Sequence, residues 1–191
     1  MTQLAPDLRA DLDLAVAAAR AAGEAVMRFF RHGGEVRYKG PEQPVTDADL
    51  AADRILRERL LAARPEYGWL SEETADSPER LGRRRVWVVD PIDGTNSFVQ
   101  GIPEFAVCVG LAEEGRAVLG VVYDPATDEL YSAAAGGGAF RNGEPIRVSG
   151  AGERRVLASR SELRRGEFAA FREGWSVAPM GSTAYRMAKV A

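Results

Sequence analysis

Two aspartates three residues apart, directly after an apolar run, are the feature of this sequence most suited to chemistry. Residues 86–89 are Val-Trp-Val-Val, Asp90 follows them, and Asp93 lies in the turn beyond. Two carboxylates this close repel one another unless a cation lies between them. Carboxylate and carbonyl oxygens are hard ligands that suit Mg²⁺, Mn²⁺ or Ca²⁺. The spacing therefore predicts a divalent-cation site at Asp90 and Asp93.

A second predicted strand also ends in carboxylates. Residues 67–70 read as a short strand that runs into Glu72 and Glu73. If the strands over 67–70 and 86–89 are parallel neighbours, their acidic ends converge on one spot. Taken singly, Asp-Pro and Asp-Gly are common turn dipeptides, and a pair of glutamates in a loop is usually solvated. Together, the two acidic strand ends favour a cation site.

The residues after Asp93 add a place for an anion. Gly94 permits a tight turn, and Thr95 and Asn96 start a predicted helix. The carboxyl ends of strands are where ligands bind in α/β layers, and a helix N-terminus offers free N–H groups to a phosphate. The alternative for Thr95 is a simple N-cap of the following turn.

Composition excludes several other classes of protein. The chain has 191 residues, 46% of them hydrophobic, and 25 Lys and Arg against 28 Asp and Glu give a formal charge of −3. This balance describes a globular protein that binds no nucleic acid polymer. His32 is the only histidine and Cys108 the only cysteine, which excludes intrachain disulfides and His- or Cys-based zinc sites. No apolar stretch reaches the ~18 residues of a membrane span, so we expect a cytoplasmic protein with no membrane contact.

Two helices are expected at the start of the chain. An apolar stripe predicts a helix over residues 7–32, which Gly33 ends. A loop over 39–44 leads to Thr46, which can cap a second helix to about residue 64. Asp49 lies three residues after Thr46, where a capping-box carboxylate belongs.

The strands that follow form an antiparallel meander. Strands are predicted over 105–112, 117–123, 129–135 and 146–148, with a hairpin turn at Asn142-Gly143. The run of 86–89 is expected to be buried on both faces. Two helices before a meander imply a layered α+β domain over 1–150. Strands and helices then alternate, which predicts the beginning of a C-terminal α/β domain over 151–191; this domain looks incomplete. Its expected elements are a strand at 156–159, a helix at 162–173, a strand at Val177 and a helix at 182–191.

Four motifs in this order resemble the inositol monophosphatase family, which includes the 3′(2′),5′-bisphosphate nucleotidases. The main motif is Asp90-Pro-Ile-Asp-Gly-Thr-Asn-Ser-Phe98 with Glu72-Glu73 upstream. The other matches are Val45-Thr-Asp-Ala-Asp49, the hairpin segments Gly120–Pro125 and Gly136–Phe140 with Asn142-Gly143, and Gly181-Ser-Thr-Ala184. The likeness covers about residues 15–191.

The resemblance implies a fold and an activity. The fold would be an α/β/α/β/α sugar-phosphatase-like sandwich, with its C-terminal α/β part incomplete. The activity would be a Mg²⁺-dependent phosphomonoester hydrolase that activates water with two metal ions. Its substrate would be a small phosphorylated metabolite, either inositol monophosphate or adenosine 3′,5′-bisphosphate. Mn²⁺ would substitute for Mg²⁺, Li⁺ would inhibit, and the protein would be a homodimer.

Residue roles follow from the same resemblance. The metal ligands would be Glu72, Asp90, the carbonyl of Ile92, and Asp93. Asp49 and Thr95 would orient and deprotonate the attacking water. The substrate would contact Gly94, Thr95, Gly181, Ser182 and Thr183. Ser182 is equally suited to be an N-cap, and Glu73 to be a neighbour of the site without being a ligand.

One departure from the family pattern keeps an alternative open. The family completes its second metal site with an aspartate in a Trp-Asp motif beyond the Gly-Ser-x-Ala loop, and no such motif occurs up to Ala191. The alternative is therefore a catalytically weak or inactive protein that binds metal and phosphate. Aspartyl-phosphate phosphatases are a third option, but their two aspartates are two apart, whereas Asp90 and Asp93 are three apart.

Overall fold

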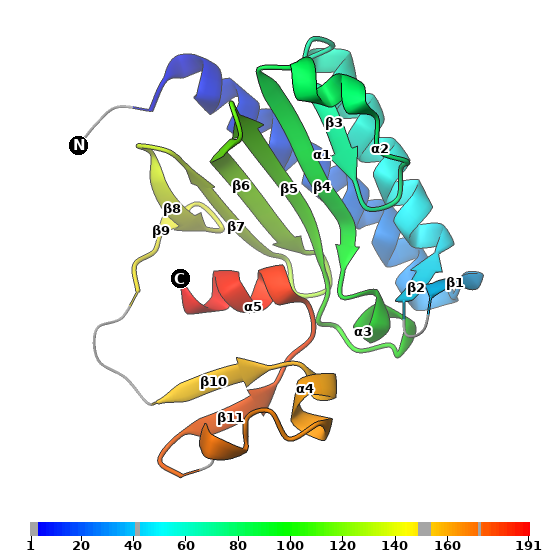
Figure 1. Ribbon diagram of the computed structural model, residues 1–191, viewed down its shortest axis with the longest axis vertical. Coiled ribbons are helices and arrows are strands. Elements are labelled where there is room, and N and C mark those ends of the chain that lie inside the picture. Colours follow the sequence, from blue (N-terminus) through cyan, green and yellow to red (C-terminus); the bar gives the residue numbers. More distant parts are fainter. Residues whose placement is uncertain (1–3, 41–42, 149–153, 172) are drawn as a thin grey trace.

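A seven-stranded sheet forms the centre of the molecule, with two long helices on one face and a shorter helix on the other (Figure 1). The computed structural model describes residues 4–40, 43–148, 154–171 and 173–191. The fold is a layered α+β arrangement, as the sequence predicts.

The two long helices pack together on the sheet. Helix α1 (Pro6–His32) starts with a proline, and Gly33, with a φ of 75°, ends it. Helix α2 (Asp47–Ala63) begins with a complete capping box between Thr46 and Asp49. Both predicted helices are confirmed. Their buried alanines and leucines join the apolar side chains of the strands in the main core. No helix in the described ranges is long and apolar enough to cross a membrane.

The sheet has the strand order β3-β4-β5-β6-β7-β8-β9. Its strands are β3 (Gly68–Ser71), β4 (Arg85–Asp93), β5 (Ala106–Glu113), β6 (Arg116–Asp124), β7 (Glu129–Ala134), β8 (Gly138–Arg141) and β9 (Glu144–Pro145). Strands β3 and β4 are parallel neighbours, which is the condition under which their acidic ends converge, and the remaining pairs are antiparallel. The strand predicted at 146–148 is wrong: Asn142 and Gly143 both have positive φ, and this tight turn pairs Arg141 directly with Glu144.

The prediction that residues 86–89 are buried on both faces is also wrong. Successive side chains of a strand point to opposite faces of the sheet. Trp87 and Val89 lie under the helices, whereas Val88 on the other face is 41% exposed. Helix α5 (Thr183–Val190) covers that second face over β6 and not over β4, where its contacts are sparse (Figure 1).

Small elements surround the carboxyl end of β4. Strands β1 (Val36–Gly40) and β2 (Gln43–Thr46) form a hairpin where the sequence predicted a loop over 39–44; residues 41–42 lie outside the described ranges. Helix α3 (Thr95–Val99) follows β4. The short 3₁₀ helix η1 (Pro78–Gly82) lies at the other end of the strand, beside Gly68 at the start of β3.

Two parallel strands, β10 (Arg155–Ala158) and β11 (Ser176–Pro179), form a separate sheet below the main one (Figure 1). The single helix predicted over 162–173 is wrong. Helix α4 (Arg160–Arg164) ends just before Gly166, whose φ of 76° is left-handed, and a 3₁₀ turn η2 (Ala169–Phe171) follows. Residue 172 lies outside the described ranges.

Candidate active site

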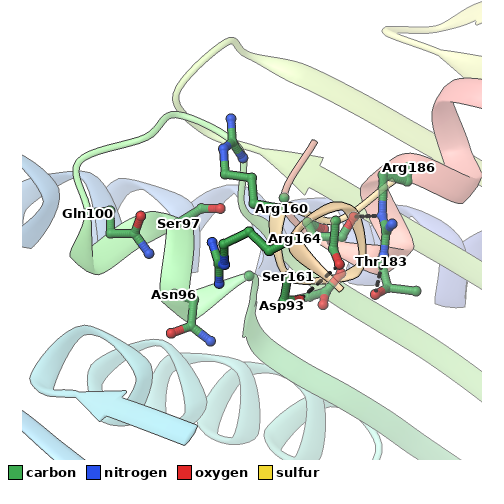
Figure 2. Close-up of a pocket in the computed structure, with 13 residues that line it drawn as sticks. Asp93, Asn96, Ser97, Gln100, Arg160, Ser161, Arg164, Thr183 and Arg186 are labelled. Atoms are coloured by element: carbon green, nitrogen blue, oxygen red, sulfur yellow. Dashed lines mark hydrogen bonds between the residues drawn. The ribbon is translucent and has the colours of Figure 1, made fainter. Parts of the chain in front are cut away.

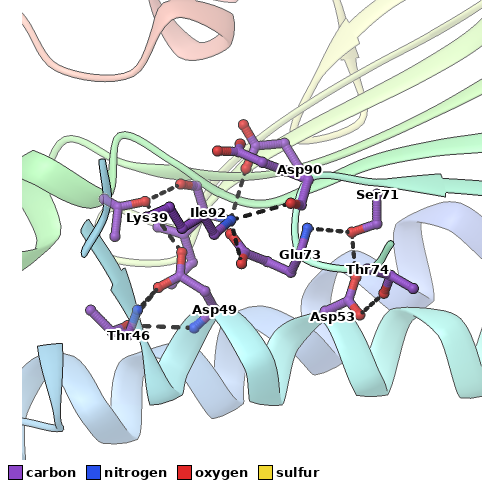
Figure 3. Close-up of polar contacts among 11 residues, drawn as sticks. Lys39, Thr46, Asp49, Asp53, Ser71, Glu73, Thr74, Asp90 and Ile92 are labelled. Carbon is purple, nitrogen blue, oxygen red and sulfur yellow. Dashed lines mark hydrogen bonds and ion pairs between the residues drawn. The ribbon is translucent and has the colours of Figure 1, made fainter. Parts of the chain in front are cut away.

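The parallel pairing of β3 and β4 brings the predicted acidic residues together. Ser71 is in register with Val89, so Glu72 and Asp90 are the next residues on neighbouring strands. The register of β4 against β5 shifts between Asp90 and Asp93, which marks an irregular end to the strand. The chemistry-bearing residues therefore sit where regular pairing ends, and several of them are shown in Figure 3.

Burial and the neighbouring carboxylates both act on the pKa of Asp90. Burial, together with the negative charges of Glu72 and Asp93, raises the pKa of Asp90 to about 8. The Ile92 N–H donates a 3.1 Å hydrogen bond to the carboxylate, which offsets only part of this effect. A positive charge at this point would stabilise the ionised form of all three groups.

Asp49 has two sets of partners, one on each carboxylate oxygen. Its Oδ2 accepts hydrogen bonds from the backbone N–H and the hydroxyl of Thr46, at 2.7 and 2.6 Å. Its Oδ1 lies 3.2 Å from the hydroxyl of Thr95, which is also 2.9 Å from the carbonyl oxygen of Ile92. Burial raises the pKa of Asp49. The helix cap and the proposed catalytic contact use different oxygens, so the two roles are compatible.

Asp93 contacts the start of helix α5. Its Oδ2 accepts hydrogen bonds from the Ser182 hydroxyl at 2.5 Å and from the Ala184 N–H at 2.7 Å. The same Ser182 hydroxyl oxygen accepts from the Tyr185 N–H, so Ser182 is the N-cap of α5, as the sequence suggested. Thr183 is exposed beside it. The structure thus brings two of the predicted substrate residues next to a predicted metal ligand.

Gly94 lies where three backbone segments meet. Its φ is 99°, and a Cβ there would be 3.0 Å from the carbonyl oxygen of Glu104 and 3.1 Å from the nitrogen of Ser182. Gly94 is also the N-cap of α3, so the first backbone N–H groups of that helix lie next to Asp93 in the chain. Gly181 lies close by, but its N–H donates to Glu104 Oε2 at 2.6 Å.

The loop after β3 is held by contacts from two other elements (Figure 3). Lys39 of β1 pairs with Glu73 Oε2 at 2.6 Å, and its Nζ is 3.2 Å from the carbonyl oxygen of Glu72. The Glu73 side chain is 5% exposed, so it is not a solvated loop carboxylate. Asp53 of α2 accepts hydrogen bonds from Ser71 and from Thr74, the latter at 2.6 Å.

The donor set suits a hard divalent cation. Its members are carboxylates and one carbonyl, and burial together with the charges of Glu72 and Asp93 raises the pKa of Asp90. Within the described part of the chain, however, no three Asp, Glu, His or Cys side chains already surround a common point. The residues fit such an ion by the chemistry of their oxygens and by their charge.

Sequence reasoning missed an arginine-lined pocket beside Asp93. The pocket has a volume of about 330 Å³, and Arg160, Arg164 and Arg186 line it together with residues of α3 (Figure 2). Arg160 and Arg164 are four apart along α4, a spacing visible in the sequence, but nothing local predicts that Arg186 joins them.

The fold and site define a layered α+β protein with a hard-ligand acidic centre next to a helix N-terminus. The chain belongs to the inositol monophosphatase family: residues 7–191 match the sequence profile of that family. Among solved structures it is similar to the extragenic suppressor protein SuhB of Bartonella henselae. The TM-score is 0.85 at 31% identity, over 95% of this chain and 74% of that one.

Two curated relatives carry enzyme names. The inositol-1-monophosphatase of Rhizobium meliloti (strain 1021) is 46% identical over 152 residues, which are 77% of this chain and 54% of the relative. The histidinol-phosphatase of Chlorobaculum parvum is 42% identical over 144 residues, 75% of this chain and 55% of the relative. The chain spans about half the length of these curated relatives.

Proposed function

We propose that this chain carries the metal- and phosphate-binding centre of a Mg²⁺-dependent phosphomonoesterase. The observation that carries the proposal is the parallel pairing of β3 and β4, which places Glu72, Asp90 and Asp93 at one edge of the sheet beside the N-terminus of α3. Burial and the charges of Glu72 and Asp93 raise the pKa of Asp90 there. Family membership supports it, since the relatives are named phosphatases.

Each residue of the centre has a role in this proposal. Glu72, Asp90, the carbonyl of Ile92, and Asp93 would hold Mg²⁺. When bound, Mg²⁺ lowers the pKa of a water and neutralises charge on a phosphate.

Two further groups act on water and phosphate. Asp49 accepts the proton of the attacking water, and the Thr95 hydroxyl, 3.2 Å from its Oδ1, orients that water. The N–H groups of Gly94 and Thr95 bind the phosphate, and Ser182 and Thr183 contact the rest of the substrate.

The substrate, in our proposal, is inositol monophosphate or adenosine 3′,5′-bisphosphate. One relative is named for inositol 1-phosphate and another for histidinol phosphate, so small phosphorylated metabolites are the class. We further propose that Mn²⁺ replaces Mg²⁺, that Li⁺ inhibits, and that the protein is a cytoplasmic homodimer. Residues 1–150 would form the metal- and phosphate-binding domain, and residues 151–191 would belong to an α/β domain.

A second candidate is a protein that binds metal and phosphate but turns over little. It is favoured by the contacts of Asp93, whose Oδ2 already accepts hydrogen bonds from Ser182 and Ala184 and is thus less available to a second ion.

Phosphate release tests the proposal and separates these candidates. The chain is assayed with inositol 1-phosphate and adenosine 3′,5′-bisphosphate, in Mg²⁺ and in EDTA. Asp90→Asn is compared with Asp13→Asn, an exposed position on α1, and Mg²⁺ binding is measured by titration calorimetry. We expect Mg²⁺-dependent release that Asp90→Asn abolishes together with Mg²⁺ binding, while Asp13→Asn keeps both.

The outcomes are distinct. Mg²⁺ binding without phosphate release would favour the binding protein over the enzyme. Unchanged Mg²⁺ affinity in Asp90→Asn would remove Asp90 from the metal site. Inhibition of phosphate release by LiCl, but not by NaCl, would support the proposal that Li⁺ inhibits the enzyme.

A further inference from the structure

The pocket beside Asp93 is lined by side chains of both charges. Asp93 lines it together with Arg160 and Arg164 of α4 and Arg186 of α5 (Figure 2), and Gly94 is also among its lining residues. We infer that this pocket selects substrates with a second anionic group, a phosphate or a carboxylate, besides the phosphate to be removed. The inference rests on the proposed function and specifies its substrate class.

Arg160 is held in place by a carboxylate that does not line the pocket. Its Nη1 and Nη2 donate to the two carboxylate oxygens of Glu104, at 2.5 and 3.1 Å. Glu104 Oε2 also accepts from the Gly181 N–H, which ties the arginine to the loop that starts α5. A guanidinium has five N–H donors, so Arg160 keeps others for a ligand.

Arg186 is positioned in a similar way. It pairs with Glu162 at 2.9 Å and donates to the carbonyl oxygen of Ser182 and to the hydroxyl of Thr183. Its side chain is 14% exposed. Like Glu104, Glu162 is not among the residues that line the pocket. Both arginines therefore face the pocket while their counter-charges lie behind them.

Arg164 supplies the charge that is not compensated. It is exposed and, within the described residues, makes no ion pair, whereas Arg160 and Arg186 each pair with a glutamate. It stands four residues after Arg160 on α4, a spacing at which two like charges on a helix repel each other. An anion between them would relieve this repulsion.

The planar guanidinium fork matches the oxygens of phosphate and carboxylate, which it can bind by two parallel hydrogen bonds. The carboxylate that lines the pocket is Asp93, which we propose as a ligand of the cation. A substrate bound by its reacting phosphate at Gly94 thus extends toward Arg160 and Arg164. A second anionic group there gains charge-assisted hydrogen bonds, a neutral polyol gains less, and an ammonium group is repelled.

Matched pairs of compounds test the inference. Adenosine 5′-monophosphate is compared with adenosine 3′,5′-bisphosphate, and glycerol 3-phosphate with 3-phosphoglycerate, so that each pair differs by one phosphate or one carboxylate. Binding is measured by calorimetry in EDTA, and kcat/KM is measured in Mg²⁺. Histidinol phosphate serves as the phosphorylated amine.

The variants are Arg164→Gln and, as a matched control, Arg116→Gln at the start of β6. Arg116 is exposed and lies at the end of the sheet opposite to Asp90. In the wild-type chain we expect about tenfold tighter binding of the member with two anionic groups in at least one pair. Arg164→Gln should reduce this ratio at least fivefold, and Arg116→Gln should leave it unchanged.

The two proposals fail in different ways. The anion site would be overturned by equal affinity within both pairs, or by no binding of adenosine 3′,5′-bisphosphate and 3-phosphoglycerate. Equal losses in Arg164→Gln and Arg116→Gln, or preferential binding of histidinol phosphate, would also overturn it. Absence of Mg²⁺-dependent phosphate release from every compound would defeat the proposed function, while the calorimetric ratios would still decide the inference. A preference in only one pair would identify whether phosphate or carboxylate is recognised.

Discussion

The carboxylate of Asp93, at the end of β4, accepts a 2.5 Å hydrogen bond from the hydroxyl of Ser182, 89 residues further along the chain. Ser182 has a φ of 52°, in the left-handed region that residues other than glycine seldom adopt. This backbone conformation is held by contacts on both sides, since the same hydroxyl oxygen caps α5 at Tyr185. The geometry of the acidic centre and the position of α5 are therefore linked through one side chain.

Removing that hydroxyl should destabilise the chain. Ser182→Ala loses the N-cap of α5 and the hydrogen bond to Asp93, and each is worth about 1 kcal/mol. We expect the free energy of unfolding in urea to fall by about 1–2 kcal/mol. Ser176→Ala, at an exposed position on β11, is the control. Equal unfolding curves for the two variants would show that Ser182 does not anchor the helix.

Asp53 is expected to hold the acidic loop in position for metal binding. It is 8% exposed and accepts hydrogen bonds from Ser71 and Thr74, on either side of Glu72. Asp53→Asn replaces one acceptor oxygen by an NH₂ group that faces a hydroxyl. Residues that orient metal ligands typically change affinity by about 10–100-fold when mutated. We therefore expect Mg²⁺ affinity to fall by roughly tenfold.

The matched control for this effect is Asp76→Asn in the same loop. Asp76 is 49% exposed and pairs with Arg80, and exposed pairs contribute at most about 1 kcal/mol. Unchanged Mg²⁺ affinity in Asp53→Asn, measured on protein shown to be folded by circular dichroism, would limit Asp53 to a structural role.

Local signals in the sequence predicted the parts of the fold that depend on neighbouring residues. The capping box at Thr46 and Asp49 and the turn at Asn142-Gly143 are complete within a few residues, and the structure contains both. The pairing of β3 with β4 was only a condition in the sequence argument: if the strands were parallel neighbours, their acidic ends would converge. The structure meets this condition, because parallel strands place the residues after their ends at the same edge.

Features that depend on distant packing were not predictable in this way. The exposure of Val88 depends on what lies across the second face of the sheet. The arginine pocket forms only because α4 and the start of α5 meet beside α3, so Arg160 and Arg186 gain their places from tertiary contacts with Glu104 and Glu162. The assignment of the metal and catalytic residues stays a prediction until it is tested.

Glu129 should make stability fall in acid. Burial alone raises the pKa of Glu129, but hydrogen bonds from Lys189 and Tyr185, with the charge of Arg141, outweigh it and lower the pKa to about 2. Because this folded-state pKa lies below the ordinary value of 4.5, the carboxylate stabilises the fold above pH 4.5. That contribution, about 3 kcal/mol, is lost as the pH falls from 4.5 towards 2.

Glu129→Gln should therefore lower stability at pH 7 and have a smaller effect at pH 3. The free energy of unfolding in urea at both pH values measures this, with Glu144→Gln on β9 as an exposed control. An equal loss of stability between pH 7 and pH 3 in the wild-type chain and in Glu129→Gln would show that the Glu129 carboxylate is not the source of the acid sensitivity.

The last prediction concerns Gly181, where the loop before α5 approaches the backbone of the site most closely. A Cβ at this position would overlap the hydroxyl oxygen of Ser97 and lie 2.5 Å from the carbonyl oxygen of Glu104. A carbonyl cannot rotate away as a flexible side chain can, so the loop itself must shift in Gly181→Ala. The shift would break the hydrogen bond from the Gly181 N–H to Glu104 and move Ser182 away from Asp93.

We expect Gly181→Ala to lose about 1–3 kcal/mol of stability, as overpacked sites commonly do, and to bind adenosine 3′,5′-bisphosphate more weakly than the wild-type chain. The control is Gly82→Ala, where a Cβ would meet no atom within 4 Å. Thermal unfolding measures the first effect and calorimetry in EDTA the second. Because the loop connects Asp93 to Arg160 through Glu104, both effects should appear together. A variant with normal stability and normal affinity would show that this close approach is relieved elsewhere and that the loop does not couple the acidic centre to the arginine pocket.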